Sequence, residues 1–346
     1  MIGSTIIGVV GILLILLIVY DAIRTTLSVS SSGGPLTNRL VSGMWFVLLA
    51  IHQRRKSHSM LSSVGPWMTM TLLLTWFLVA WLGWFFLFCS SPQAVVLSSS
   101  NAAAGLVERA YYTGYTLTTL GYGDFVAGND SWRLPPILAA ANGFFLFTIS
   151  ITYILNIITN VIEKRQTSLT ISALGENPQQ ILDSTNDSGK YATLLSQLQP
   201  LQQSISTLGQ QHLAYPILHY YHSETSSKAL SLAIAKLYQA IAIAYFASSR
   251  LDTASREQLL IARKTIEQFL DTLGGNFIHP SRHTPDIPVL IEYAELPGFE
   301  KSSTEIQNYL ASLPYQKILL AYVHKDGWQW QEVWHSEEGQ STNTRS

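Results

Sequence analysis

Long apolar stretches are confined to the first half of the chain. Asp, Glu, Lys and Arg are absent from residues 1–20, 57–107 and 134–162, whereas they recur regularly after Glu163. A helix needs about 20 apolar residues to cross the hydrocarbon core of a bilayer, which is roughly 30 Å thick. The pattern therefore predicts transmembrane helices over residues 2–20, 64–88 and 134–162.

These spans divide the chain into four predicted parts. Residues 1–23 are expected to be an N-terminal transmembrane anchor, since 2–20 has neither the basic start nor the cleavage site of a secretory signal. Residues 24–63 are a predicted cytoplasmic linker, in which the apolar stretch 40–51 is too short to span and is expected to lie at the interface or packed beneath the spans. Residues 64–162 hold the other two spans, and 163–346 form a predicted, mainly helical cytoplasmic domain.

Basic residues indicate the orientation of the spans. Lys and Arg are enriched in loops on the cytoplasmic side of a membrane. The run Arg54, Arg55, Lys56 and the pair Lys164-Arg165 are such clusters. With three spans, they predict a multi-pass protein of the cell membrane whose N terminus is outside and whose C-terminal domain is cytoplasmic.

Composition restricts the class of protein further. Of the 346 residues, 47% are hydrophobic and only 12% are charged, against about 25% charged in soluble domains, so the lipid bilayer is an expected partner. The net charge of −1 gives no indication of a nucleic-acid partner. A single cysteine, Cys89, excludes an internal disulfide framework and a cysteine-based metal cluster. No nucleophile–base pair or glycine-rich nucleotide fingerprint stands out, so an enzyme is not expected.

The connection between the second and third spans contains an unusual segment. The stretch "LVERAYYTGYTLTT" is compatible with a short helix, and the glycines of "LGYGD" then break it. Extended chain at membrane depth is tolerated only where its carbonyls are enclosed by protein or face a water-filled path. Gly121 and Gly123 permit the backbone angles that aim successive carbonyls at one axis, where oxygens can replace the hydration shell of a cation.

At this point the sequence resembles a known family. The run Thr119-Leu120-Gly121-Tyr122-Gly123-Asp124 is similar to the selectivity filter of potassium channels, usually written TVGYGD. Tyr111-Tyr112 occupy the position, two turns before the filter threonine, where pore helices of the family often carry aromatic residues. Gly143 falls where many inner helices of the family bend. Leu120 departs from the usual valine or isoleucine, which changes the side-chain packing behind the filter and leaves its carbonyl in place.

The resemblance implies an all-α membrane protein with a tetrameric potassium-channel pore. Its parts are an outer helix over 64–88, a pore helix over 106–118, a filter over 119–124 and an inner helix over 134–162. The implied ion-binding residues are Thr119, Leu120, Gly121, Tyr122 and Gly123, with K⁺ held at the first four, and the implied filter supports are Asp124, Tyr111, Tyr112 and Thr118. K⁺ is then the transported ion, and no cofactor is expected.

The last predicted span carries a polar stripe. Thr148, Thr152, Asn156 and Thr159 recur at steps of four, four and three, which places them along one face of a helix. They either form a hydrated pore wall or hydrogen-bond their own and neighbouring helices. Gly143 is likewise either a hinge or a site of close packing.

The C-terminal half contains three further features. The apolar stretch around 230–245 is expected to be a buried soluble helix, because Lys236 would be costly in lipid. Asp326-Gly327 is expected either to turn a hairpin or to end a helix. The cluster His219, Tyr220, Tyr221, His222 and Glu224 is expected to have a surface or packing role rather than to bind a metal.

Three functions remain to be compared. The first is passive, potassium-selective conduction through a homotetramer, gated by a cytoplasmic domain that assembles the tetramer or senses an unidentified ligand. No span carries the spaced arginines that sense voltage. The second is a membrane-tethered sensor or signalling protein with a non-conducting or weakly selective pore. The third, a potassium-uptake transporter subunit, is disfavoured because that class carries four pore loops per chain.

Overall fold

The computed structural model describes residues 2–27, 33–52, 58–186, 189–288 and 298–335. Its contacts divide the chain into two compact units, which we treat separately. Unit 1 comprises Met1–Arg55, Pro66–Ile157 and Ala214–Ile217, and unit 2 comprises Lys56–Gly65, Ile158–Leu213 and Leu218–Ser346. Within the described ranges the strands are limited to one short antiparallel pair, so the chain is an all-α membrane protein, as predicted.

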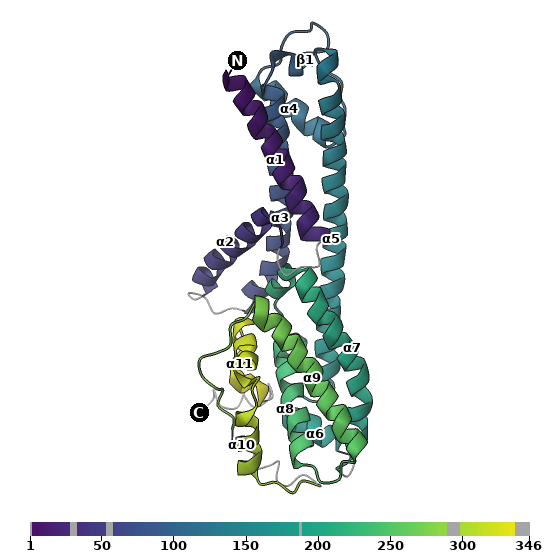
Figure 1. The fold of residues 1–346 in the computed structure, drawn as a ribbon, viewed down its shortest axis with the longest axis vertical. Coiled ribbons are helices and arrows are strands. Elements are labelled where there is room, and N and C mark those ends of the chain that lie inside the picture. The colour runs from purple at the N-terminus through teal and green to yellow at the C-terminus, as the bar shows by residue number, and fades with distance from the viewer. Residues whose placement is uncertain (1, 28–32, 53–57, 187–188, 289–297, 336–346) are drawn as a thin grey trace. The chain divides into compact units, whose positions relative to one another are not determined.

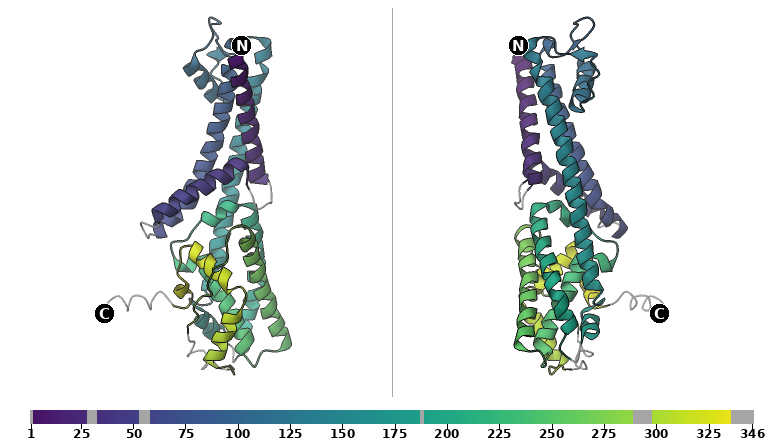
Figure 2. Two further views of the ribbon diagram at one scale, coloured as in Figure 1. Left: turned by 60° about the vertical axis from the view of Figure 1, so that its left-hand side comes forward. Right: turned by 90° about the vertical axis from the view of Figure 1, so that its right-hand side faces the viewer.

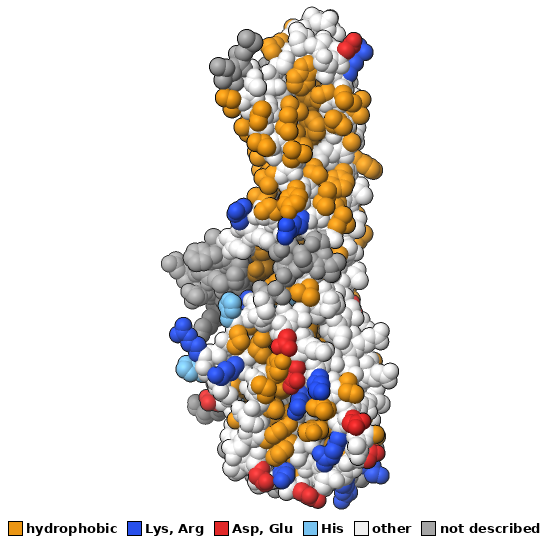
Figure 3. All heavy atoms as spheres, in the orientation of Figure 1, with side chains coloured by type: hydrophobic (Ala, Val, Ile, Leu, Met, Phe, Trp, Pro, Cys, Tyr) orange, Lys and Arg blue, Asp and Glu red, His pale blue; other side chains and the backbone are white. Residues whose placement is uncertain are grey.

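Within the described residues, unit 1 is built from four longer helices and the short helix α4 (Figures 1 and 2). They are α1 (Ile2–Leu27), α2 (Pro35–His52), α3 (His58–Cys89), α4 (Leu106–Leu117) and α5 (Leu134–Ser172), the last of which continues into unit 2. Helices α1, α3 and α5 each contain a segment long and apolar enough to cross a membrane. Hydrophobic side chains cover the visible surface of these helices in Figure 3, whereas charged side chains mark the surface of unit 2.

Helices α1 and α3 pack closely through glycines. A Cβ atom placed on Gly11 would lie 2.6 Å from the carbonyl oxygen of Gly83, and a Cβ on Gly83 would lie 2.9 Å from the side chain of Ile15. Small residues let membrane helices approach until their backbones touch, which replaces the hydrophobic drive that lipid does not supply. The first span is therefore packed against the second, and does more than tether the chain.

A buried carboxylate begins α2. Asp21 near the end of α1 is fully buried, and its Oδ1 accepts hydrogen bonds from the backbone N–H groups of Leu36 (2.7 Å) and Thr37 (3.1 Å). The Thr37 hydroxyl donates to Oδ2 at 2.5 Å, and the indole of Trp76 on α3 donates to the same oxygen at 3.0 Å. Acceptors at a helix start satisfy N–H groups that have no partner inside the helix.

Helix α2 covers and exceeds the short apolar stretch predicted at 40–51. It runs for 18 residues from Pro35 to His52 and is not among the helices that qualify as spans in the described part of the chain. The basic run Arg54, Arg55, Lys56, on which the predicted orientation rests, lies outside the described residues.

Loops and short elements join α3, α4 and α5. A 3₁₀ turn, η1 (Pro92–Ala94), precedes strand β1 (Val96–Leu97), which pairs antiparallel with β2 (Phe125–Val126) after α4. Val96 lies opposite Val126, and Leu97 lies opposite Phe125. A second 3₁₀ turn, η2 (Asp130–Trp132), leads into α5. The β1–β2 pairing places the segments before and after α4 side by side.

Unit 2 is a helical domain around α8. Its further elements are α6 (Pro178–Thr185), α7 (Ala192–Ala214), η3 (Pro216–Tyr220), η4 (Ser226–Lys228), α8 (Leu230–Ala247), α9 (Thr253–Asn276), α10 (Ser303–Ser312), α11 (Gln316–Lys325) and η6 (Trp330–Val333). Helix α8 is apolar enough to span a membrane, but 89% of it is buried, against 28%, 39% and 33% for the other three candidates. Helices α6, α9, α10 and α11 all contact it, so α8 is the centre of this core.

Glycines at two places in unit 2 have different effects on the helices there. Gly327 has φ +88° and follows Asp326, the C-cap residue of α11, so Asp326-Gly327 ends a helix and does not turn a hairpin. Helix α9, in contrast, continues through Gly274 and Gly275 to Asn276.

Candidate functional site

The short helix α4 leads into residues 119–124, the filter-like segment. Its first turn is capped by Glu108, whose Oε2 accepts a hydrogen bond from the backbone N–H of Gly105 at 2.7 Å. At the other end, the Thr118 N–H and hydroxyl both bond to the Gly114 carbonyl, at 3.1 and 2.9 Å. Helix α4 thus ends at Leu117, one residue before the predicted limit.

The backbone changes character after Thr118. Thr119, Gly121 and Gly123 have φ values of +60°, +59° and +79°, while Leu120 and Tyr122 between them do not have positive φ. In a strand, successive carbonyls point to opposite sides, whereas alternating the sign of φ turns them toward the same side. Glycine adopts positive φ at little cost, so the two glycines account for two of the three unusual positions.

Most of the surface of this segment is uncovered within the single chain. Residues 118–124 are all exposed, and the side chains of Leu120 and Tyr122 retain 62% and 66% of their accessible surface. A Cβ atom placed on Gly121 or Gly123 would meet no atom within 4 Å. The segment is therefore open to a ligand or to further copies of the chain.

Aromatic side chains of α4 support the segment from behind. Tyr122 stacks on Tyr111, with ring centroids 6.2 Å apart, and meets the edge of Tyr115 at 5.9 Å. The hydroxyl of Tyr115 is buried and donates to the Phe125 carbonyl at 2.8 Å. Tyr112 points elsewhere and packs edge-on against Phe88 of α3 at 5.0 Å.

Asp124 closes the segment at its C-terminal end. Its Oδ1 accepts from the backbone N–H of Phe125 at 3.1 Å, and its own carbonyl accepts from the N–H of Ser98 at 2.9 Å. The second bond continues the β1–β2 pairing. The segment is thus held at its start by α4 and at its end by a two-stranded ladder.

Helix α4 is fastened to the surrounding chain by one buried cation. Arg109 is 6% exposed, and its Nε donates to the Ala104 carbonyl at 2.8 Å. Its terminal nitrogens donate to the carbonyls of Ser91 (2.7 Å), Pro92 (3.3 Å) and Phe88. The planar guanidinium has five N–H donors and can bond several carbonyls at once. Arg109 therefore ties α4 to the end of α3.

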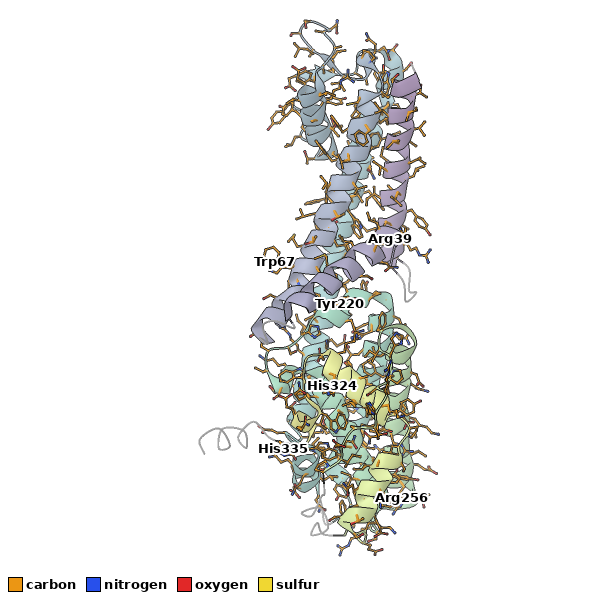
Figure 4. The ribbon with its side chains drawn as sticks, turned by 90° about the vertical axis from the view of Figure 1, so that its left-hand side faces the viewer. Arg39, Trp67, Tyr220, Arg256, His324 and His335 are labelled. Carbon is orange, nitrogen blue, oxygen red and sulfur yellow. The ribbon has the colours of Figure 1, made fainter. Side chains whose placement is uncertain are left out.

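Two tryptophans of α3 donate hydrogen bonds to α4 and α5. Trp81 donates to the carbonyl of Ala110 on α4 at 3.2 Å, and Trp84 donates to Asn142 on α5 at 3.0 Å. Trp84 is 5% exposed, whereas Trp67, labelled in Figure 4, is 70% exposed.

Gly143 lies where α5 meets α4. A Cβ atom at this position would collide with the carbonyl oxygen of Leu117, the last residue of α4. Helix α5 is continuous through Gly143. Gly143 is therefore closely packed against the end of α4, and its predicted role as a hinge stays a prediction.

The polar stripe of α5 lies on an exposed face of the chain. Thr148 and Thr152 donate their hydroxyl hydrogens to the carbonyls of Phe144 (2.9 Å) and Thr148 (3.1 Å), one turn earlier. Asn156 donates to the hydroxyl of Tyr215 at 2.9 Å. Thr159 is also exposed. Bonding to the helix leaves the hydroxyl oxygens able to accept from water, so both predicted roles are compatible with the geometry.

The structure brings the predicted site residues together in three groups. The first is the segment 119–124 with Thr118 and Tyr111, the second is the exposed stripe of α5, and the third is Gly143 with Leu117. Sequence reasoning missed Tyr115 and Arg109. Both carried a signal: Tyr115 is four residues from Tyr111 and so shares its helix face, and Arg109 is the first basic residue after a charge-free stretch of 51 residues, which spans 57–107.

Comparisons with known proteins cover the part of the chain that contains α4 and residues 118–124. Residues 67–160 match a family model described as "Ion channel". The chain is also similar to an uncharacterized membrane protein, YdjJ, of Bacillus subtilis (strain 168), with 27% identity over 300 residues that cover 86% of this chain and 87% of that protein. No solved structure matches the chain. The family match indicates an ion-channel segment that contains α4, the filter-like segment and most of the last span.

Proposed function

We propose that the protein is a potassium channel that conducts K⁺ passively through a homotetrameric pore. The observation that carries the proposal is the alternation of φ at Thr119, Gly121 and Gly123, in a segment similar to the potassium-channel filter. Carbonyl oxygens turned to one side replace the water around a dehydrated cation. K⁺ is held at Thr119, Leu120, Gly121 and Tyr122, and Gly123 completes the filter.

Several copies are needed because the described chain supplies one such segment. The exposed face of residues 118–124, the exposed stripe of α5 and exposed apolar residues of α5 such as Phe144 and Phe147 support burial against neighbouring subunits. Closed rings of identical subunits are the usual form of such assemblies. Resemblance to the potassium-channel family supports four.

The remaining parts have supporting roles. Thr148, Thr152, Asn156 and Thr159 line the water-filled path below the filter. The N terminus lies outside, and unit 2 lies in the cytoplasm, where it biases the pore through α5. Digestion of unit 2 by a protease applied outside intact cells would contradict this topology.

Ion flux tests the function directly. The purified full-length protein is placed in liposomes loaded with K⁺ or Na⁺, and efflux is followed at equal driving force. We expect K⁺ efflux to exceed Na⁺ efflux strongly, whereas equal efflux would refute selectivity. Absence of any flux would favour a membrane-tethered sensor with a non-conducting pore.

A further inference from the structure

Unit 2 contains a small cavity, lined by charged, histidine and tyrosine residues, that the proposed function does not use. Its lining residues come from segments far apart in the chain: Lys164 of α5, His219 of η3, His222 shortly after it, Tyr322 and Lys325 of α11, and Asp326 at the end of α11. Tyr220, labelled in Figure 4, stands between the two histidines in sequence. With a volume of about 10 Å³, the cavity admits a single particle about the size of a water molecule.

The negative charge at the cavity is already engaged. The carboxylate of Asp326 accepts from His222 Nδ1 at 2.6 Å through one oxygen and from the hydroxyl of Ser231 at 2.6 Å through the other. Burial raises the pKa of Asp326, but Lys164, His222 and Ser231 lower it by more, so its pKa lies below the usual value and the group is ionised at neutral pH.

The lysines that line the cavity outnumber its one carboxylate. Lys164 is 5% exposed and donates to the Tyr221 carbonyl at 2.9 Å, and Lys325 donates to the Phe277 carbonyl. Each ammonium has three donors, so each keeps two after these bonds. Burial lowers the pKa of His219 well below its usual value, so His219 adds no charge at neutral pH. Two lysines therefore face one aspartate.

A third donor points into the same space. Tyr322 also lines the cavity and is 3% exposed, and its hydroxyl has no hydrogen-bond partner among the described residues. Buried polar groups without a partner are uncommon because each costs the energy of its lost hydration. Burial also raises the pKa of Tyr322 far above its usual value, so the phenol keeps its proton and acts as a donor.

We propose that this cavity binds one halide-sized monovalent anion, with chloride as the ligand, held by the ammonium groups of Lys164 and Lys325 and the hydroxyl of Tyr322. The anion balances the excess of buried positive charge and gives the Tyr322 hydroxyl an acceptor. Burial lowers the pKa of both Lys164 and Lys325, and a bound anion opposes this by favouring their charged forms. The size of the cavity excludes phosphate and nucleotides.

Chloride binding is measured on the full-length protein in detergent by thermal unfolding. The K⁺ concentration and ionic strength are kept constant, and gluconate is replaced stepwise by chloride, bromide or phosphate. We expect the unfolding temperature to rise to a plateau with chloride and bromide, and not with phosphate. Equal curves for all the anions would overturn the proposal, because a cavity that holds only water has no halide preference.

Two variants and two matched controls locate the effect. Tyr322→Phe removes only a hydroxyl, and Lys325→Gln removes one charge, so each is expected to raise the half-saturating chloride concentration at least tenfold. Tyr191→Phe also removes a buried hydroxyl without a described partner, and Lys301→Gln removes an exposed lysine charge, yet neither residue lines the cavity. Unchanged chloride dependence in both cavity variants would refute the site.

Bromide provides a direct check of position. In crystals of the full-length protein grown with KBr, we expect an anomalous peak within hydrogen-bond distance of Tyr322 Oη and both lysine Nζ atoms. Density for water alone would overturn the proposal. Neither measurement depends on conduction, so the anion site and the proposed function fail or stand separately.

Discussion

The indole nitrogen of Trp76 donates a hydrogen bond to the carboxylate of Asp21 at 3.0 Å, although the two residues are 55 positions apart. Both side chains are completely buried. The same carboxylate begins α2 through Leu36 and Thr37. One acidic residue therefore connects the end of α1, the start of α2 and the middle of α3.

Replacement of Asp21 by alanine is expected to destabilise unit 1. It leaves the N–H groups of Leu36 and Thr37 and the indole of Trp76 buried without an acceptor, and each such group costs about 1–3 kcal/mol. We expect a total loss on the order of 3 kcal/mol or more, seen as a lower unfolding temperature in detergent. Trp76→Phe should cost less because it removes one donor only, and Trp67→Phe, at an exposed position, should cost nothing measurable. Equal stability of Asp21→Ala and wild type would contradict this account.

Gly143 provides a second test, of the packing beneath the filter-like segment. In Gly143→Ala the added methyl group meets the carbonyl of Leu117, so α4 and α5 have to separate. Overpacking of this kind costs about 1–3 kcal/mol, and we expect lower stability together with reduced K⁺ flux. Gly114→Ala is the matched control, since its Cβ would lie no closer than 3.7 Å to another group. A Gly143→Ala protein with normal stability and flux would show that this contact is unimportant.

The sequence predicts the elements better than the contacts between them. Helices α1, α3 and α5 follow from the absence of charge over about 20 residues, and the end of α4 follows from the glycines at 121 and 123. The Asp21–Trp76 bond requires three helices to be placed first. In the same way, the sequence does not reveal that His222 meets Asp326, because 104 residues separate them.

Some residues have a role in the fold that differs from the usual local preference of their type. Tryptophan is enriched at membrane–water interfaces, but Trp84 is buried and donates a hydrogen bond to Asn142 of α5. Gly274 and Gly275 are typical helix ends, yet α9 passes through them to Asn276. In both cases tertiary packing outweighs a local preference.

The filter proposal predicts a loss of function without a loss of folding for Gly121→Ala. At φ +59° an alanine costs about 1–2 kcal/mol, because its Cβ crowds the following carbonyl. The carbonyl is expected to rotate, so K⁺ flux should be abolished while membrane insertion and subunit assembly are retained. Gly105→Ala is the control, with φ −73° and no close contact for the new methyl group. Normal K⁺ flux through Gly121→Ala would refute the filter assignment.

Tyr115 is expected to hold the filter in shape. In Tyr115→Phe the Phe125 carbonyl loses its 2.8 Å bond, which contributes about 1 kcal/mol to stability. The aromatic contact with Tyr122 remains, so we expect a folded protein with a lower ratio of K⁺ to Na⁺ flux. Tyr20→Phe, which removes an exposed hydroxyl of α1, should leave that ratio unchanged. An unaltered ratio in Tyr115→Phe would mean that the bond does not constrain the ion path.

The pH dependence of stability is expected to reveal His212 in the core of unit 2. Burial, with a further contribution from Lys164, lowers the pKa of His212 from 6.5 to about 4, and the bond from Nδ1 to the Leu208 carbonyl only partly opposes this. The unfolded chain therefore binds more protons than the folded chain between pH 4 and pH 6.5. Stability accordingly rises with pH across that window, and about 3 kcal/mol is lost on acidification from 6.5 to 4.

Thermal unfolding of the full-length protein between pH 4 and pH 7.5 measures this effect. His212→Phe keeps an aromatic ring beside Phe269 but cannot bind a proton, so its unfolding temperature should fall less steeply on acidification. The exposed His283 is the control, and His283→Gln should follow the wild type. Asp326 cannot produce the same slope, because its pKa lies below 3.8 and its contribution is lost only at lower pH. An identical slope in His212→Phe would mean that a different buried group, such as His219, controls the acid lability of unit 2.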